Sequence, residues 1–141
     1  KSTVPSDISF SSLRIVIDCA NGACYKVSPK IFEELGAEVI TIGNLPDGYN
    51  INQECGSTHP QIIKKAVIKH RADFGISLDG DGDRVIIVDE KGTILDGDDL
   101  LYILAFSNPN RVGPWSGVVG THMSNLGLEE GINKLGYKFI S

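Results

Sequence analysis

The sequence has few cysteines, no block of like charges and no long apolar run. Its three cysteines, Cys19, Cys24 and Cys55, form no CxxC pair, which favours a reduced, cytoplasmic protein over a disulfide framework. The 13 basic and 18 acidic residues give a net charge of −5 without a basic stretch, so neither nucleic acid nor a membrane surface is an expected partner. No apolar run reaches the roughly 18 residues of a membrane span, and the first residues lack the apolar core of a signal peptide.

The length and composition are those of an ordinary globular protein. The chain has 141 residues, of which 41% are hydrophobic and 22% charged, so it has room for one domain or for one domain and a piece of another. No short repeat or low-complexity tract interrupts the sequence. Residues 1–12 are polar and linker-like and contain no initiating Met, so we expect the chain to be a segment of a longer protein.

The spacing of apolar residues predicts alternating strands and helices. Strands are expected at residues 13–17, 37–42, 74–78, 85–88, 93–95, 117–120 and 137–140. Helices are expected at residues 27–35, from Pro60 to before Asp73, at 98–106 and at 126–135. Strand, helix and strand within about 30 residues form a βαβ unit with a right-handed crossover. This order predicts an α/β fold in which helices flank a mixed sheet in α/β/α layers.

A boundary near residue 95 divides these elements into two parts. Residues 1–95 are expected to form one complete α/β domain, and residues 96–141 are expected to begin a second, partial α/β domain. A connector rich in Pro, Gly and Asn is expected at residues 108–114.

Two helices carry specific packing expectations. Val27, Ile31 and Leu35 repeat every four residues and, with Phe32 widening the stripe, predict the inward face of the first helix, which Gly36 ends. The helix at residues 98–106 is unusually apolar, so we expect it to be buried.

The most informative stretch is the acidic loop, Asp79-Gly80-Asp81-Gly82-Asp83-Arg84. At an effective dielectric of about 20, two carboxylates roughly 5 Å apart repel by on the order of 3 kcal/mol, so a cation is expected among the three aspartates. Carboxylates are hard ligands, which favours Mg²⁺ or Ca²⁺. The loop follows a predicted strand, and open α/β sheets bind their ligands at the carboxyl ends of strands.

The alternatives for this loop are weaker. A solvated turn would not need three aspartates at strict spacing between two apolar strands. An EF-hand would place Asp79, Asp81, Asp83 and Glu90 at ligand positions, but Arg84 stands where that calcium loop demands glycine. Arg84 itself has two interpretations: a salt-bridge partner for the aspartates, or a bidentate contact to a phosphoryl group beside the metal. A metal and an arginine together favour phosphoryl transfer.

The acidic loop resembles the magnesium loop of the α-D-phosphohexomutase family. Residues 46–52 and 55–58 resemble the bacterial phosphoglucosamine mutase branch of that family, as do residues 18–23 and 120–129. His122 departs from the pattern, because an aliphatic residue is expected there. The match runs over nearly the whole chain and implies the second domain and the start of the third domain of a four-domain enzyme.

The resemblance implies a cytoplasmic isomerase that interconverts glucosamine 6-phosphate and glucosamine 1-phosphate for UDP-N-acetylglucosamine biosynthesis, a branch of carbohydrate metabolism. In this family a phosphoserine donates its phosphoryl group, and a bisphosphorylated sugar reorients before returning a phosphate to the serine. Asp79, Asp81 and Asp83 would hold Mg²⁺ together with a phosphoserine oxygen, and Arg84 would contact the phosphoryl group. The partner implied is a phosphosugar substrate, bound with the missing domains, and the full-length protein could form a homo-oligomer.

The phosphoserine nucleophile is expected outside this chain. In the family the serine directly precedes a histidine, whereas here Thr58 precedes His59, so Thr58 or Ser57 is instead expected to cap the helix that begins at Pro60. The general acid/base is also expected elsewhere, and the isolated chain is expected to be inactive. The alternatives are a phosphomannomutase or phosphoglucomutase of the same family, a metal-stabilised binding domain without catalysis, and a metal-dependent phosphatase with an aspartate nucleophile.

Overall fold

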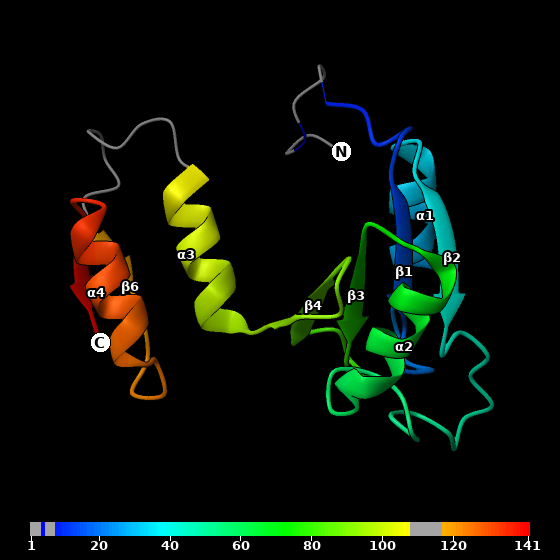
Figure 1. Cartoon of the computed structure of the whole chain (residues 1–141). Coiled ribbons are helices and arrows are strands. Elements are labelled where there is room, and N and C mark those ends of the chain that lie inside the picture. Colours follow the sequence, from blue (N-terminus) through cyan, green and yellow to red (C-terminus); the bar gives the residue numbers. More distant parts are fainter. Residues whose placement is uncertain (1–3, 5–7, 108–116) are drawn as a thin grey trace. The chain divides into compact units, whose positions relative to one another are not determined.

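A computed structural model describes Val4 and residues 8–107 and 117–141, and divides the chain into two compact units, Lys1–Ile94 and Leu95–Ser141 (Figure 1). The connector predicted at residues 108–114 lies outside the described residues. Among the helices that are described, none has the length and apolar character needed to cross a membrane.

The first unit is built on a five-stranded mixed sheet with the strand order β2-β1-β3-β4-β5. The central strand β1 runs parallel to both β2 and β3, and β3 runs antiparallel to β4. This arrangement confirms the predicted mixed α/β sheet. The strands are β1 (Arg14–Asp18), β2 (Glu38–Ile42), β3 (Phe74–Leu78), β4 (Val85–Asp89) and β5 (Ile94–Leu95).

Two helices cover the two faces of this sheet. Successive side chains of a strand point to opposite faces, so Val16 packs on one side, with the helix α2 (Pro60–His70), and Ile15 and Ile17 pack on the other. The second face is covered by α1 (Val27–Glu34) through Phe32. The result is the α/β/α layering predicted from the order of elements.

The inward face of α1 differs from the prediction. Val27 and Ile31 are 59% and 44% exposed, whereas Pro29 is buried and Phe32 packs on the core. Within the predicted stripe, the inward position of Phe32 is therefore confirmed, whereas that of Val27 and Ile31 was wrong. The Phe32 ring is stacked 6.3 Å from the ring of Phe10. Gly36 ends the helix in the left-handed region, at φ 97°, as predicted.

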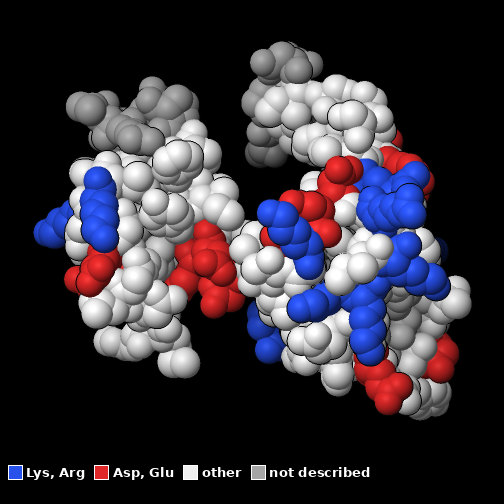
Figure 2. Space-filling model, in the orientation of Figure 1, with Lys and Arg blue, Asp and Glu red and all other residues white. Residues whose placement is uncertain are grey.

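Helix α2 begins at Pro60, as predicted, but no side chain caps it. His59 occupies the N-cap position without a side-chain hydrogen bond, so the predicted cap from Ser57 or Thr58 is wrong. The Thr58 hydroxyl lies 3.1 Å from Nδ1 of His59 instead. Figure 2 shows basic side chains gathered on the face of the first unit that carries α2, with acidic side chains beside them.

The described residues of the second unit form a two-stranded parallel sheet and two helices. Its core joins Ala105, Leu128, Ile132 and Tyr137, all at most 9% exposed. The elements are α3 (Gly97–Ser107), β6 (Gly117–Val119), α4 (Leu126–Lys134) and β7 (Lys138–Ile140).

Helix α3 is apolar as predicted, but it is not buried. Leu104 and Phe106 are 67% and 56% exposed, and only Ala105 is buried. The expectation of burial was wrong because the described residues of this unit cover one side of the helix, where Leu101 and Ala105 meet α4 and the sheet.

Candidate metal site

The acidic loop lies where β3 ends, at the carboxyl edge of the two parallel strands β1 and β3. The Gly82 N–H donates to the Asp79 carbonyl at 3.1 Å and closes a tight turn, after which β4 begins at Val85. Gly82 has a φ of 77°, which glycine adopts at no steric cost. The turn therefore brings together the side chains at alternate positions of the loop, those of Asp79, Asp81 and Asp83.

The three predicted ligands, Asp79, Asp81 and Asp83, come together in the structure. One carboxylate oxygen from each lies within 4.8 Å of the others. Asp79 is buried at 2% exposure, while Asp81 and Asp83 are exposed, so the cluster has a fixed base and an open side. The charges on Asp81 and Asp79 raise the pKa of Asp83, which expresses the repulsion that a cation would relieve. Metal binding by these residues stays a prediction.

Arg84 pairs with the buried member of this cluster. Its Nε donates to Oδ2 of Asp79 at 2.8 Å, its backbone N–H donates to Oδ1 at 3.1 Å, and Nε lies 3.7 Å from Oδ1 of Asp83. The hydrogen bond from Arg84 holds the pKa of Asp79 well below its usual range. The side chain of Arg84 is still 65% exposed. The structure therefore contains the salt bridge, and the phosphoryl contact of Arg84 stays a prediction.

The turn after β1, residues 19–24, packs its backbone against the backbone of the acidic loop. The Ala23 N–H donates to the Gly80 carbonyl at 2.8 Å. A Cβ at Gly22 would collide with the backbone of Gly80, so this approach requires glycine at position 22. The Sγ atom of Cys24 lies where a side chain at Gly82 would be.

The long loop between β2 and α2 borders the acidic loop at other points. The side chain of Ile51 covers Gly80, and the Ser57 N–H donates to the Leu78 carbonyl at 2.8 Å. The Asn52 N–H donates to the Ala20 carbonyl at 2.8 Å, which joins the long loop to the turn.

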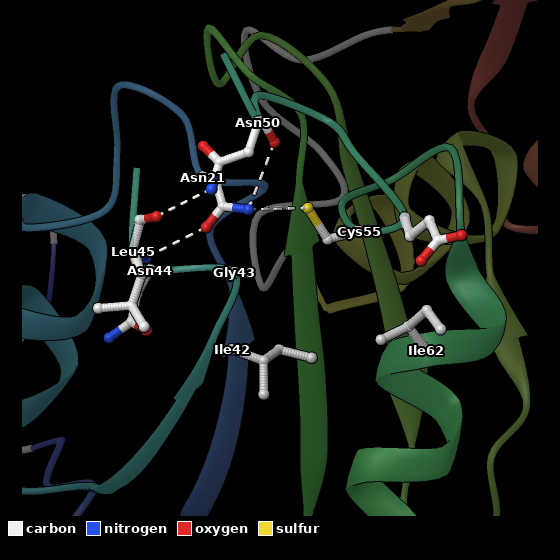
Figure 3. Close-up of a pocket in the computed structure, with 9 residues that line it drawn as sticks. Asn21, Ile42, Gly43, Asn44, Leu45, Asn50, Cys55 and Ile62 are labelled. Atoms are coloured by element: carbon white, nitrogen blue, oxygen red, sulfur yellow. Dashed lines mark hydrogen bonds between the residues drawn. The ribbon is translucent and has the colours of Figure 1, made fainter. Parts of the chain in front are cut away.

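Asn21 makes a further connection between this turn and the long loop, at a cavity of about 330 Å³ shown in Figure 3. Its Nδ2 donates to the Asn50 carbonyl at 3.4 Å and points to Sγ of Cys55, and its Oδ1 accepts from the Leu45 N–H at 3.1 Å. The sequence predicted only a turn at Asn21, because partners 24 and 29 positions away leave no local signal.

Asp18 is another residue of the site. The sequence placed it in a turn and in the family-like stretch of residues 18–23, without giving it a role of its own. This carboxylate is fully buried at the end of β1, where it accepts backbone hydrogen bonds from Ala20 and Gly56. Burial raises its pKa, which the two N–H groups oppose. A charged residue directly after a run of buried strand residues is the local signal that could have drawn attention to it.

The fold and the loop together define an α/β/α domain with a carboxylate cluster at the carboxyl edge of its sheet. Residues 2–92 match the family described as phosphoglucomutase/phosphomannomutase, α/β/α domain II, and the chain belongs to this family. The resemblance drawn from the acidic loop is therefore confirmed.

Curated relatives narrow the similarity within the family. The chain is 53% identical over 139 residues to a phosphoglucosamine mutase of Thioalkalivibrio sulfidiphilus and 56% identical over 139 residues to one of Legionella pneumophila. These matches cover 99% of the chain, which spans 31% and 30% of the two relatives.

A solved structure supports the fold. A phosphoglucomutase/phosphomannomutase family protein of Burkholderia thailandensis superposes with a TM-score of 0.81 at 24% identity, over 95% of this chain and 30% of that one. The assignment of the two units to successive domains of a longer protein stays a prediction.

Proposed function

We propose that this chain is the metal-binding part of a magnesium-dependent mutase that interconverts glucosamine 6-phosphate and glucosamine 1-phosphate. The observation that carries the proposal is the carboxylate cluster of Asp79, Asp81 and Asp83, with oxygens within 4.8 Å of one another at the carboxyl edge of the sheet. The names of the curated relatives, phosphoglucosamine mutase, support the choice of sugar.

The donor set fits a hard divalent cation. Three carboxylates supply only oxygen ligands, and two of them are exposed on the open side, which leaves room for water or a phosphoryl oxygen. When bound, Mg²⁺ would neutralise and polarise phosphoryl oxygens. Its ligands would be Asp79, Asp81 and Asp83.

The chain's own residues would hold the reacting group in place. Asp79 is anchored through two hydrogen bonds from Arg84, so the base of the cluster is rigid. The exposed guanidinium of Arg84 would donate to a phosphoryl group on the open side of the loop. Phosphoryl transfer depends mainly on positioning and charge neutralisation, which are what these residues can supply.

The remaining parts of the reaction would come from the rest of the protein. The chain spans about 30% of its curated relatives, and we assign the phosphoserine, the general acid/base and the contacts to the sugar of the bisphosphorylated intermediate to the other part. The isolated chain should then show no turnover.

The test is an assay of the full-length protein that contains this chain, with glucosamine 6-phosphate as substrate and mannose and glucose phosphates as comparisons. Asp81→Asn removes one charged ligand from the exposed side, and we expect the turnover rate to fall on the order of 100-fold. Glu90→Gln, a matched loss of an exposed carboxylate in the β4–β5 turn, should leave the rate unchanged.

Two results would contradict the proposal. Full activity of the Asp81→Asn protein would remove the metal role of the loop. Faster conversion of mannose or glucose phosphate than of glucosamine phosphate would place the protein in another branch of the family.

A further inference from the structure

Asp18 is a buried carboxylate outside the metal cluster. It is 0% exposed, and its Oδ1 accepts from the Ala20 N–H at 3.0 Å while its Oδ2 accepts from the Gly56 N–H at 2.7 Å. No lysine or arginine of the described residues forms a salt bridge with it. Because burying a charge is costly, its place at the end of β1 calls for a reason beyond packing.

The two N–H groups belong to the two segments that border the acidic loop. Ala20 lies in the turn of residues 19–24, whose Ala23 N–H donates to the Gly80 carbonyl at 2.8 Å. Gly56 lies in the long loop, whose Ile51 side chain covers Gly80. Each oxygen of Asp18 therefore holds one of the two segments that contact the acidic loop at Gly80.

Both segments have backbone conformations that need support from their surroundings. Ala20, Asn21, Asn52 and Glu54 have φ values of 54°, 48°, 58° and 50°, in the left-handed region that non-glycine residues seldom adopt. Such conformations persist only where tertiary contacts hold them. The hydrogen bonds to Asp18 supply such contacts at Ala20 and at Gly56. Each of the four residues is one of these two or lies within a few positions of one of them in the sequence.

We propose that Asp18 is a positioning residue for the acidic loop, which it holds through the turn of residues 19–24 and the long loop. Both segments contact Gly80, which lies between Asp79 and Asp81 in the sequence. They therefore set the distance between the carboxylates that would bind the cation. The inference rests on the metal role proposed above. Groups that orient ligands from outside the coordination sphere typically change metal affinity 10- to 100-fold when they are removed.

Asp18→Asn tests this role with a side chain of nearly the same shape. The amide keeps one acceptor oxygen but places an NH₂ group against a backbone N–H, so one of the two segments loses its tether. We expect the affinity of the full-length protein for Mn²⁺, added alone and followed by electron paramagnetic resonance, to fall about 10-fold. The matched control is Ile63→Val, which removes a buried methylene group on the α2 face and lowers stability without touching the acidic loop.

A second pair of variants avoids the buried core. Ile51→Ala removes the side chain that covers Gly80 and should lower Mn²⁺ affinity severalfold. Ile51 is 53% exposed, so its truncation should cost little stability. Leu45→Ala, in the same loop and 79% exposed, should bind Mn²⁺ as the unmodified protein does.

The outcomes separate the two proposals. If the unmodified protein does not bind Mn²⁺, the metal role fails and this inference fails with it. If the unmodified protein binds Mn²⁺, and folded Asp18→Asn protein, checked by circular dichroism, binds it equally well, only the positioning role is overturned. If Asp18→Asn does not fold, equal affinities of Ile51→Ala and Leu45→Ala overturn the positioning role.

Discussion

Strand β1 of the first unit and the elements α3 and β6 of the second unit differ in how well their apolar residues are covered. Ile15, Val16 and Ile17 on β1 are all 0% exposed, whereas Leu104 on α3 and Val119 on β6 are 67% and 71% exposed. Strand β1 has a neighbouring strand on each side and a helix on each face, while β6 pairs with β7 in a two-stranded sheet. In these elements, burial follows the number of layers packed around the element more closely than its apolar content.

The candidate metal site lies in the first unit, whose sheet is covered by helices on both faces. The acidic loop follows β3 of this sheet, and Asp79 is buried at the base of the cluster. The turn of residues 19–24 and the long loop between β2 and α2 both contact Gly80. A metal site needs ligands that are already close to their final positions, and a sheet covered on both faces supplies that rigidity.

The largest effect expected from this contrast comes from truncating matched aliphatic residues in the two units. Ile17→Ala should lower the free energy of unfolding by about 3 kcal/mol, because it opens a cavity in a closed core. Leu104→Ala should change it by less than about 0.5 kcal/mol, because the side chain is already exposed. Urea unfolding followed by circular dichroism measures both, and equal losses would contradict the contrast.

Mg²⁺ should stabilise the first unit alone. At ten times its dissociation constant, a cation that binds only the folded state adds about 1.4 kcal/mol. Hydrogen exchange should then slow in β3 and the acidic loop, and stay unchanged in α4 and β7. Asp81→Asn should abolish the effect, whereas an unchanged response of that variant would place the ion elsewhere.

A smaller effect is expected at the start of α3, in the second unit. Oδ1 of Asp96 accepts hydrogen bonds from the Asp98 and Asp99 N–H groups at 2.9 and 3.1 Å, and the Asp99 carboxylate accepts from the Asp96 N–H. Asp96→Ala should therefore lower stability by about 1 kcal/mol in thermal unfolding.

The matched control for the α3 cap is Glu130→Gln. Glu130 takes part in an exposed pair with Lys134, at 3.8 Å, and such pairs contribute little. If both changes had the same effect, the cap would not stabilise the helix.

Local patterns were enough to predict the order of strands and helices and the acidic loop. Short apolar runs mark the strands of the first unit, Gly36 ends α1 at a left-handed φ, and three aspartates at alternate positions lie close together in a tight loop. Each of these features depends on neighbours only a few positions away, so the sequence alone contains the information.

Tertiary structure decided which side of α1 faces inward, how much of α3 is exposed, and what Asp18 contacts. The Gly56 N–H that binds Asp18 lies 38 positions along the chain, in the loop that follows β2, and β2 itself pairs with β1. The spacing of the three aspartates is enough to crowd three carboxylates into one loop. The packing of distant segments decided how that loop is held, because a contact between such segments exists only once the sheet has formed.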